Sequence, residues 1–206
     1  ISEARKAMIS EFGGTMFTVA KDVKIQVEFN PKYVQHYRLV GYENRLMAAE
    51  DFNNDKKVGG DMGVGHLVTA IYDIIPTGVK SDEIGNVDPL KYQENKSNSI
   101  TNSSSELATV KFRYKDPQGE KSKLQEHIVL HNAVKPMSAD FNFATAVAEL
   151  GMLLRNSSYK QQANYDSLIK RAKASKGQDD EGYRAEFIKI AENAKALMKS
   201  YDLVQK

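Results

Sequence analysis

The stretch Ala108-Thr-Val-Lys-Phe-Arg-Tyr114, followed closely by Asp116-Pro-Gln-Gly119, decides the fold class. Apolar and polar residues alternate along its first part, and this period of two is typical of a half-buried β-strand. Because proline fixes φ and glycine permits a positive φ, the second part predicts a tight turn between antiparallel strands. The apolar residues that we expect to be buried together in this hairpin are Val110, Phe112, Ile128 and Leu130.

Similar strand patterns lie upstream of the hairpin. Residues 23–30 alternate strictly and end at Pro31, and a less cleanly patterned strand covers residues 36–43. After a polar loop at residues 51–65, residues 66–75 are β-branched and aromatic enough to predict a strand with both faces largely covered. A series of strands with one apolar face is usually covered by packing sheet on sheet. This part of the chain therefore predicts an antiparallel, β-sandwich-like module.

The pattern changes to a helical period near Pro136. Three amphipathic helices are predicted from apolar residues spaced three and four apart. Their predicted buried stripes are Phe143, Val147, Leu150 and Leu154; Tyr165, Leu168, Ile169 and Ala172; and Tyr183, Phe187, Ile190, Ala194, Leu197 and Tyr201. A short N-terminal helix is predicted at residues 2–12, ended by Gly13-Gly14. Together these elements predict the α+β class.

The composition of the chain argues against several classes of function. The formal net charge is +2 and no long basic run is present, so the charge pattern typical of nucleic-acid binding is missing. The chain has no cysteine, which excludes disulfides, thiol catalysis and cysteine-ligated zinc. No apolar run approaches the roughly 20 residues that a membrane-spanning helix needs. Nucleic acid and a membrane span are therefore not expected.

Several longer motifs carry a family resemblance. They are Ala20-Lys-Asp-Val-Lys-Ile-Gln-Val-Glu-Phe-Asn-Pro31, Tyr37-Arg-Leu-Val-Gly-Tyr-Glu-Asn-Arg45, Glu50-Asp-Phe-Asn-Asn-Asp55, Gly65-His-Leu-Val-Thr-Ala-Ile-Tyr-Asp-Ile-Ile-Pro76, Asp140-Phe-Asn-Phe-Ala144 and Gly182-Tyr-Arg-Ala-Glu-Phe187. With them, the chain resembles a C-terminal domain of unknown function that follows the von Willebrand factor A domain in bacterial cell-envelope proteins. The resemblance covers nearly the whole length.

The resemblance implies a division into three parts. Residues 1–17 correspond to the end of a truncated von Willebrand factor A domain, 18–135 to the β-sandwich-like module and 136–206 to the helical module. Because the chain starts at Ile1, we expect it to be a fragment whose targeting signal lies upstream. The resemblance also implies a cell-envelope or extracellular location, in the periplasm or on the surface, with a lipid anchor at the missing N-terminus as one means of attachment.

One polar loop has the spacing of a calcium site. Asp51, Asn53 and Asp55 stand at positions one, three and five of an oxygen-lined calcium loop. However, Lys56 occupies the place of the glycine at the sharp turn, and Met62 that of the bidentate glutamate. A turn in which the Asp and Asn side chains form hydrogen bonds with their own backbone is the simpler interpretation. Whether residues 51–61 bind calcium stays open at this point.

Other patterns indicate little chemistry. His127 and His131 have the spacing of a zinc pair on a helix, but in a strand they would lie roughly 13 Å apart, too far to share a metal. His66 has no acid or nucleophile nearby in sequence. The run Gly59-Gly60-Asp-Met-Gly63-Val-Gly65 lacks the Lys-Ser/Thr ending of a phosphate loop and precedes a strand.

These observations favour a non-catalytic binding or scaffolding module of an extracytoplasmic von Willebrand factor A-domain protein, with no catalytic, cofactor-binding or metal-binding residues. We expect protein–protein or adhesion contacts, with protein partners that include the missing upstream A domain. The alternative is a metal-dependent enzyme in which Asp51, Asp55, Asp61 and His66 meet in the folded loop.

Overall fold

The computed structural model describes residues 12, 17–42, 46–81, 105–132 and 136–204. The chain divides into two compact units, and the division falls between residues 134 and 135. We call the first the strand unit and the second the helical unit, and each is described by itself.

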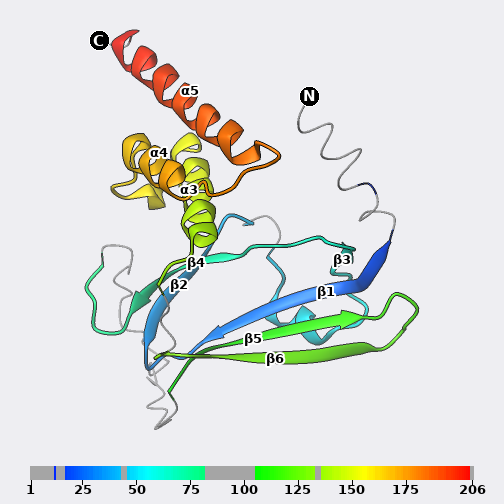
Figure 1. Cartoon of the computed structure of the whole chain (residues 1–206). Coiled ribbons are helices and arrows are strands. Elements are labelled where there is room, and N and C mark those ends of the chain that lie inside the picture. The colour runs from blue at the N-terminus through cyan, green and yellow to red at the C-terminus, as the bar shows by residue number, and fades with distance from the viewer. Residues whose placement is uncertain (1–11, 13–16, 43–45, 82–104, 133–135, 205–206) are drawn as a thin grey trace. The chain divides into compact units, whose positions relative to one another are not determined.

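The main feature of the strand unit is a four-stranded antiparallel sheet in the order β3-β1-β5-β6 (Figure 1). Its strands are β1 (Thr18–Phe29), β3 (Gly60–Gly63), β5 (Glu106–Lys115) and β6 (Ser122–Leu130). The two long inner strands β1 and β5 are those with the strictest alternation, which suits a pleated sheet with two different faces.

A second, two-stranded sheet pairs β2 (Val34–Val40) with β4 (Ile71–Pro76). A turn at Asn30 leads from β1 into β2, because the Asn30 side chain accepts a hydrogen bond from the Lys32 backbone N–H at 3.0 Å. The loop predicted over residues 51–65 contains two short elements instead, the 3-10 helix η3 (Ala49–Asn53) and the edge strand β3. Sequence reasoning missed both because neither has a hydrophobic period.

The hairpin between β5 and β6 is confirmed, but its predicted buried face is wrong. Gly119 N–H donates to the Asp116 carbonyl at 2.9 Å and the strands pair antiparallel. Val110 lies opposite His127, however, while Ile128 lies opposite Thr109. The apolar residues of the two strands therefore point to opposite faces of the sheet, and Ile128 is 51% exposed.

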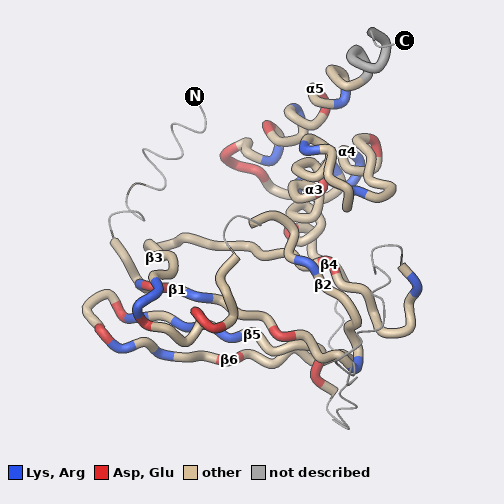
Figure 2. The backbone as a smooth tube through the Cα atoms, turned by 180° about the vertical axis from the view of Figure 1, so that it is seen from behind, with Lys and Arg blue, Asp and Glu red and all other residues tan. Residues whose placement is uncertain are grey.

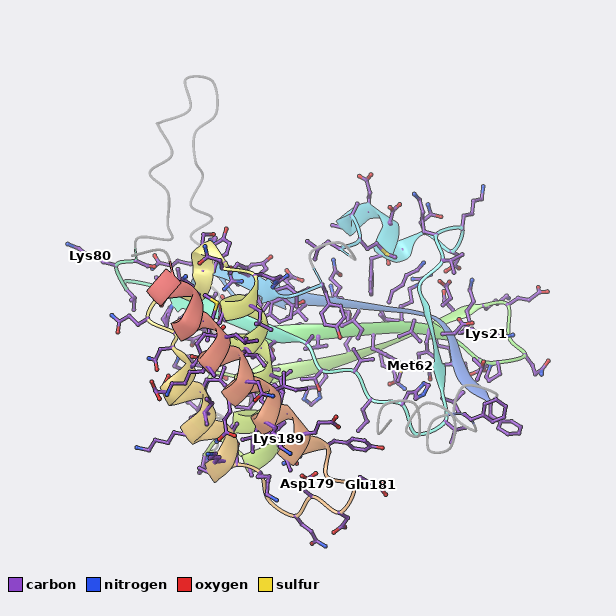
Figure 3. All side chains as sticks on the ribbon, turned by 90° about the horizontal axis from the view of Figure 1, so that it is seen from above. Lys21, Met62, Lys80, Asp179, Glu181 and Lys189 are labelled. Atoms are coloured by element: carbon purple, nitrogen blue, oxygen red, sulfur yellow. The ribbon has the colours of Figure 1, made fainter. Side chains whose placement is uncertain are left out.

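The helical unit contains α3 (Ala139–Leu154), η4 (Ser158–Lys160), α4 (Tyr165–Ala174) and α5 (Tyr183–Val204). Each α-helix begins at a side-chain cap. The Ser138 hydroxyl accepts from the Phe141 N–H, the Asn164 side chain from the Ser167 N–H, and the Asp179 carboxylate from the Arg184 and Ala185 N–H groups. Figure 3 shows Asp179 in the connection that leads into α5.

The hydrophobic core of the helical unit is small and well defined. It consists of Phe143, Ala146, Leu150, Leu168, Ile169, Ala172, Ile188 and Ala191. The predicted stripe of α4 is confirmed, because Leu168, Ile169 and Ala172 are buried. In α3 and α5 the predicted stripes are partly wrong, since Val147, Leu154, Ile190 and Leu197 are all exposed.

The α+β class is confirmed, with antiparallel sheets followed by three C-terminal helices. The predicted N-terminal helix at residues 2–12 lies outside the described residues except for Phe12.

Candidate functional site

One side of the four-stranded sheet carries an apolar surface, which we call the open face. It consists of Ile25, Val27, Val110, Phe112 and Tyr114. Ile25 lies opposite Phe112 and Val27 opposite Val110, so these side chains share one side of the pleat. Ile25 is 50% exposed and the other four are only half-buried. A sheet face of this kind normally packs against a further layer.

The second sheet contacts the main sheet through an aromatic cluster. The centroid of the Phe29 ring lies 4.7 Å from that of the Tyr37 ring and 5.5 Å from that of the Tyr72 ring. Ala108, which lies opposite Phe29, is 5% exposed. Burial and the neighbouring Tyr37 raise the pKa of Tyr72 above its usual value. Close packing is thus found at this end of the sheet and not around Ile25.

The other side of the same sheet is charged, and we call it the charged face. Lys24, Lys111, Arg113 and Lys115 alternate with the apolar residues of the open face, and Figure 2 shows the basic positions along β1 and β5. Lys111 pairs with Glu28 across the strands at 3.5 Å. Along β1 and β5 the two faces therefore differ in chemistry because these strands alternate strictly, whereas β6 adds the exposed Leu124 and Ile128 to the charged face.

A β-bulge at Asp22 organises the charged face. The β1–β5 register shifts between Lys21 and Lys24, and Asp22 has a positive φ of 53°. Its side chain is buried, with the Lys115 Nζ at 2.9 Å and the Lys24 Nζ at 3.7 Å. A buried carboxylate of this kind is stable only with such partners.

Burial of the Asp22 carboxyl raises its pKa, but Lys115, the Gly59 N–H and Lys24 together outweigh that effect. The pKa of Asp22 consequently lies below its ordinary value, and the group is charged at neutral pH. This cluster is an ion-paired anchor.

The loop that contains η3 is held against the charged face. The Lys24 Nζ donates to the Asn54 carbonyl at 2.7 Å, and Arg113 pairs with Asp55 at 3.0 Å. The Ser122 hydroxyl donates to the same Asp55 carboxylate at 2.7 Å. These two groups hold the pKa of Asp55 below its ordinary value. Phe52 of η3 is buried, with 5% of its surface exposed.

The glycine-rich run serves close packing of the backbone. A Cβ atom at Gly59 would lie only 2.3 Å from the Val23 carbonyl oxygen, so no other residue fits there without a shift. Gly59 N–H donates to the Asp22 carboxylate, and the Asp61 carboxylate accepts from the Asp22 N–H at 3.0 Å. Met62 then pairs with Ala20 of β1, close to Lys21 in Figure 3.

The residues of the predicted loop site are not brought together. Asp51 pairs with Lys57 at 3.6 Å, while Asp55 and Asp61 are engaged at separate points of the charged face. The backbone N–H of His66 donates to the Gly63 carbonyl. Across the ranges that the structure describes, no three His, Cys, Asp or Glu side chains lie close enough to hold a metal ion.

The two histidines with zinc-like spacing also have separate surroundings. His127 lies within β6 and is exposed, whereas His131 follows that strand and stacks on the Tyr33 ring at 4.2 Å. Lys32 lies over the Tyr33 ring, with its Nζ 4.9 Å from the centroid of that ring. This arrangement is typical of aromatic packing at a surface.

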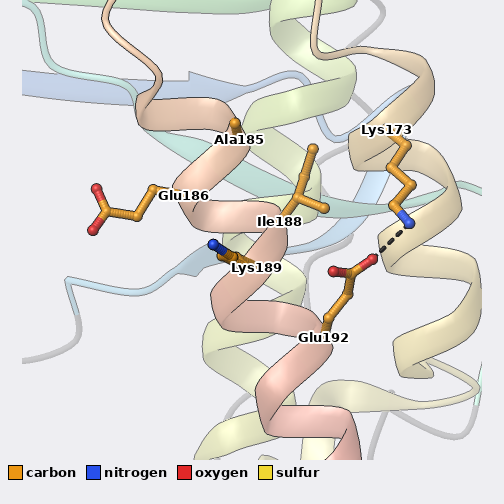
Figure 4. Close-up of a pocket in the computed structure, with 6 residues that line it drawn as sticks. All are labelled: Lys173, Ala185, Glu186, Ile188, Lys189 and Glu192. Atoms are coloured by element: carbon orange, nitrogen blue, oxygen red, sulfur yellow. Dashed lines mark ion pairs between the residues drawn. The ribbon is translucent and has the colours of Figure 1, made fainter.

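The helical unit carries a shallow depression between α4 and α5, drawn in Figure 4. It is lined by Lys173, Ala185, Glu186, Ile188, Lys189 and Glu192. Lys173 and Glu192 form an ion pair across it at 2.6 Å. Its lining contains no hydroxyl, thiol or imidazole group, and its charged side chains are two lysines and two glutamates.

Sequence reasoning missed the anchor formed by Asp22, Lys24 and Lys115. Asp22 stands just before the alternating residues 23–30, where it resembles an ordinary strand-flanking residue. The interruption of the alternation at Lys21-Asp22 is the only available signal, and it does not identify Lys115 as the partner. That pairing depends on the β1–β5 register, which only the fold determines.

Comparison with known proteins gives two matches. The family model described as "Uncharacterized protein YfbK, C-terminal" matches residues 14–197. The "Uncharacterized protein YfbK" of Escherichia coli (strain K12) is 40% identical over 194 residues, which is 94% of this chain and 33% of that protein. The chain thus spans about a third of the length of this curated relative.

No solved structure matches this chain. In the part of the chain that the structure describes, no helix has the length and apolar character needed to cross a bilayer.

Proposed function

The chain belongs to the family of the C-terminal region of YfbK, and from that membership we propose that it is a non-catalytic binding or scaffolding module of a longer protein. The single observation that carries the proposal is the open face. Ile25 is half exposed in the middle of a long strand, and its four neighbours on that face are only half-buried. Such a surface is typical of a site that binds another protein.

The partner in this proposal is the preceding part of the longer protein, a von Willebrand factor A domain in a bacterial cell-envelope protein. We propose this domain and its extracytoplasmic location because the family resemblance implies them. The length of the relative supports the presence of such a part, because the matched region accounts for only 33% of it. In this arrangement the A domain covers the open face, and the pair together supports adhesion or protein–protein contacts.

Two matched variants test the proposal. Ile25→Lys places a charge on the open face, and Ile128→Lys places the same charge on the opposite face at nearly the same exposure, 51% against 50%. Binding of the chain to the separately produced upstream region would be measured by calorimetry. Burying an unpaired charge costs several kcal/mol, so Ile25→Lys should weaken binding by about a hundredfold or more, and Ile128→Lys should leave it nearly unchanged.

Circular dichroism of both variants provides the control for folding. If Ile25→Lys folds and still binds like the unmodified chain, the open face is not the binding site. If neither the variants nor the unmodified chain binds the upstream region, the partner is a different protein.

A further inference from the structure

Helix α3 is apolar around most of its circumference, because three of its polar residues, Asn142, Thr145 and Glu149, lie within an arc of about 60°. Its only polar residues are Asp140, Asn142, Thr145 and Glu149. One side of the helix faces the core of the helical unit through Phe143, Ala146 and Leu150. An apolar surface this wide normally packs against more than one side of its surroundings, and α4 and α5 leave part of it exposed.

The uncovered side of α3 forms a second apolar surface, which we call the α3 stripe. Its members are Phe141, Ala144, Val147, Ala148, Gly151 and Leu154. At 3.6 residues per turn they lie within an arc of roughly 140° beside the core face. The large members are uncovered, since Phe141 is 46%, Val147 45% and Leu154 58% exposed. Nothing lies within 4 Å of a Cβ atom built on Gly151.

The four outer members of the α3 stripe show the same order of side-chain sizes from both ends. A large residue is followed by a small one, then by Val147 with Ala148, then by a small residue and a large one. A two-fold axis between positions 147 and 148 places Ala144 opposite Gly151, and Val147 opposite Ala148, of a second antiparallel helix. Small residues at a crossing point allow two helices to approach closely, and large residues fill the space where the axes diverge.

The charged residues at the two ends of the α3 stripe are related by the same two-fold axis. Asp140 stands at the N-terminal end of the α3 stripe and Arg155 just beyond its C-terminal end. In the antiparallel arrangement Asp140 of one copy lies at the level of Arg155 of the other. The Asp140 side chain is 81% exposed although it also pairs with Arg184, so it is accessible to a second cation. Opposite helix dipoles favour the same arrangement.

From the palindromic order of sizes and charges, we infer that the α3 stripe binds a second copy of this chain, with the two α3 helices crossing antiparallel about an axis between Val147 and Ala148. This inference concerns the helical unit and does not depend on the proposed function of the open face. A single helix pair buries less than the roughly 1,200 Å² of a standard interface, so we expect a weak, concentration-dependent dimer.

Sedimentation equilibrium over a range of concentrations tests the inference on the whole chain. Val147→Glu places a charge at the crossing point. Ile190→Glu places the same charge on an exposed apolar site of α5, where Ile190 is 51% exposed and Val147 is 45% exposed. Burying the unpaired charge should weaken dimerisation about tenfold or more for Val147→Glu only. A chain that is monomeric at all concentrations, or equal effects of the two variants, would overturn the inference.

Oxidative cross-linking tests the register, because the chain contains no cysteine of its own. A cysteine in Ala148→Cys lies near the two-fold axis and should form a disulfide between copies. A cysteine in Leu154→Cys lies opposite position 141, roughly 20 Å along the helix from its own counterpart, and should not cross-link. Efficient cross-linking of both would indicate parallel helices and contradict the antiparallel pair. Failure of Ala148→Cys to cross-link, with Val147 protected from solvent labelling in a monomer, would show that a different segment covers the stripe.

Discussion

At the scale of single residues, the Asp22 carboxylate joins several parts of the strand unit. It lies in a β-bulge, accepts from the Gly59 N–H and neutralises the side chain of Lys24, which is 1% exposed. Removal of one member of a buried ion pair leaves the other charge without compensation. Asp22 therefore links the bulge, the glycine-rich run and the loop at residues 49–59 in one arrangement.

The first prediction concerns acid stability. Because the pKa of Asp22 is lower in the folded chain than the ordinary value of 3.8, its contribution to stability is present above that pH and is lost as the pH falls through the folded pKa. Asp22→Asn should cost about 1–3 kcal/mol at neutral pH and flatten the loss of stability below pH ~4. The measurement is urea unfolding at several pH values.

The control is Asp73→Asn, which removes a partner of Arg38 at a carboxylate that is 49% exposed. An exposed ion pair of this kind contributes at most about 1 kcal/mol. Equal and small losses for both variants at neutral pH would show that Asp22 does not anchor the loop.

The second prediction uses neighbouring glycines. A Cβ atom in Gly59→Ala meets the Val23 carbonyl oxygen at 2.3 Å, whereas nothing lies within 4 Å of one in Gly60→Ala. The clash is with backbone and cannot be relieved by a side-chain rotation, so Gly59→Ala should cost roughly 1–3 kcal/mol of unfolding free energy. Gly60→Ala should change it by less than about 1 kcal/mol. A tolerated Gly59→Ala would mean that the run does not pack against β1.

At the scale of secondary-structure elements, hydrophobic patterning correctly predicts that a strand or helix is present. It is a poor guide to which face of that element is buried. The β5–β6 hairpin follows from alternation and turn chemistry, but the face that Ile128 occupies depends on the register across the turn. In the same way, α5 has two apolar rows. The sequence favours the row with Ile190 and Leu197, while the fold buries the row with Ile188 and Ala191.

Contacts between distant residues cannot be predicted from such local patterns. The spacing of Asp51, Asn53 and Asp55 correctly indicates a polar loop, yet their partners are Lys57, Arg113 and Ser122. Two of these three partners come from β5 and β6, about 60 residues away in sequence, and only the sheet register brings them to the loop. The candidate site on the open face is likewise a consequence of register.

The third prediction concerns this loop and distinguishes the module from a metal-dependent enzyme. Asp55 already accepts from Arg113 and Ser122, and Asp61 from the Asp22 N–H, so a cation would have to displace these partners. We expect EDTA to leave the melting temperature of the chain unchanged, because a metal that binds only the folded state raises stability. A fall of several degrees that calcium or zinc restores would favour the enzyme.

At the scale of the whole molecule, the two units differ in how completely they bury their apolar residues. The helical unit contains a continuous core of eight buried residues. In the described ranges of the strand unit, the buried apolar residues are Ala20, Val34, Val40, Phe52 and Ala108. A sheet with so small a core of its own gains stability from a partner that covers its apolar face. The open face thus connects the fold of the strand unit to the proposed binding function.

Hydroxyl-radical footprinting can detect whether another domain covers the open face. Labelling of Ile25 and Phe112 would be compared between this chain alone and a longer protein with the proposed upstream domain, with Ile128 on the opposite face as the internal reference. We expect Ile25 and Phe112 to be labelled in the chain alone and strongly protected in the longer protein, while Ile128 is labelled equally in both. Equal labelling of Ile25 and Phe112 in the two proteins would contradict this expectation.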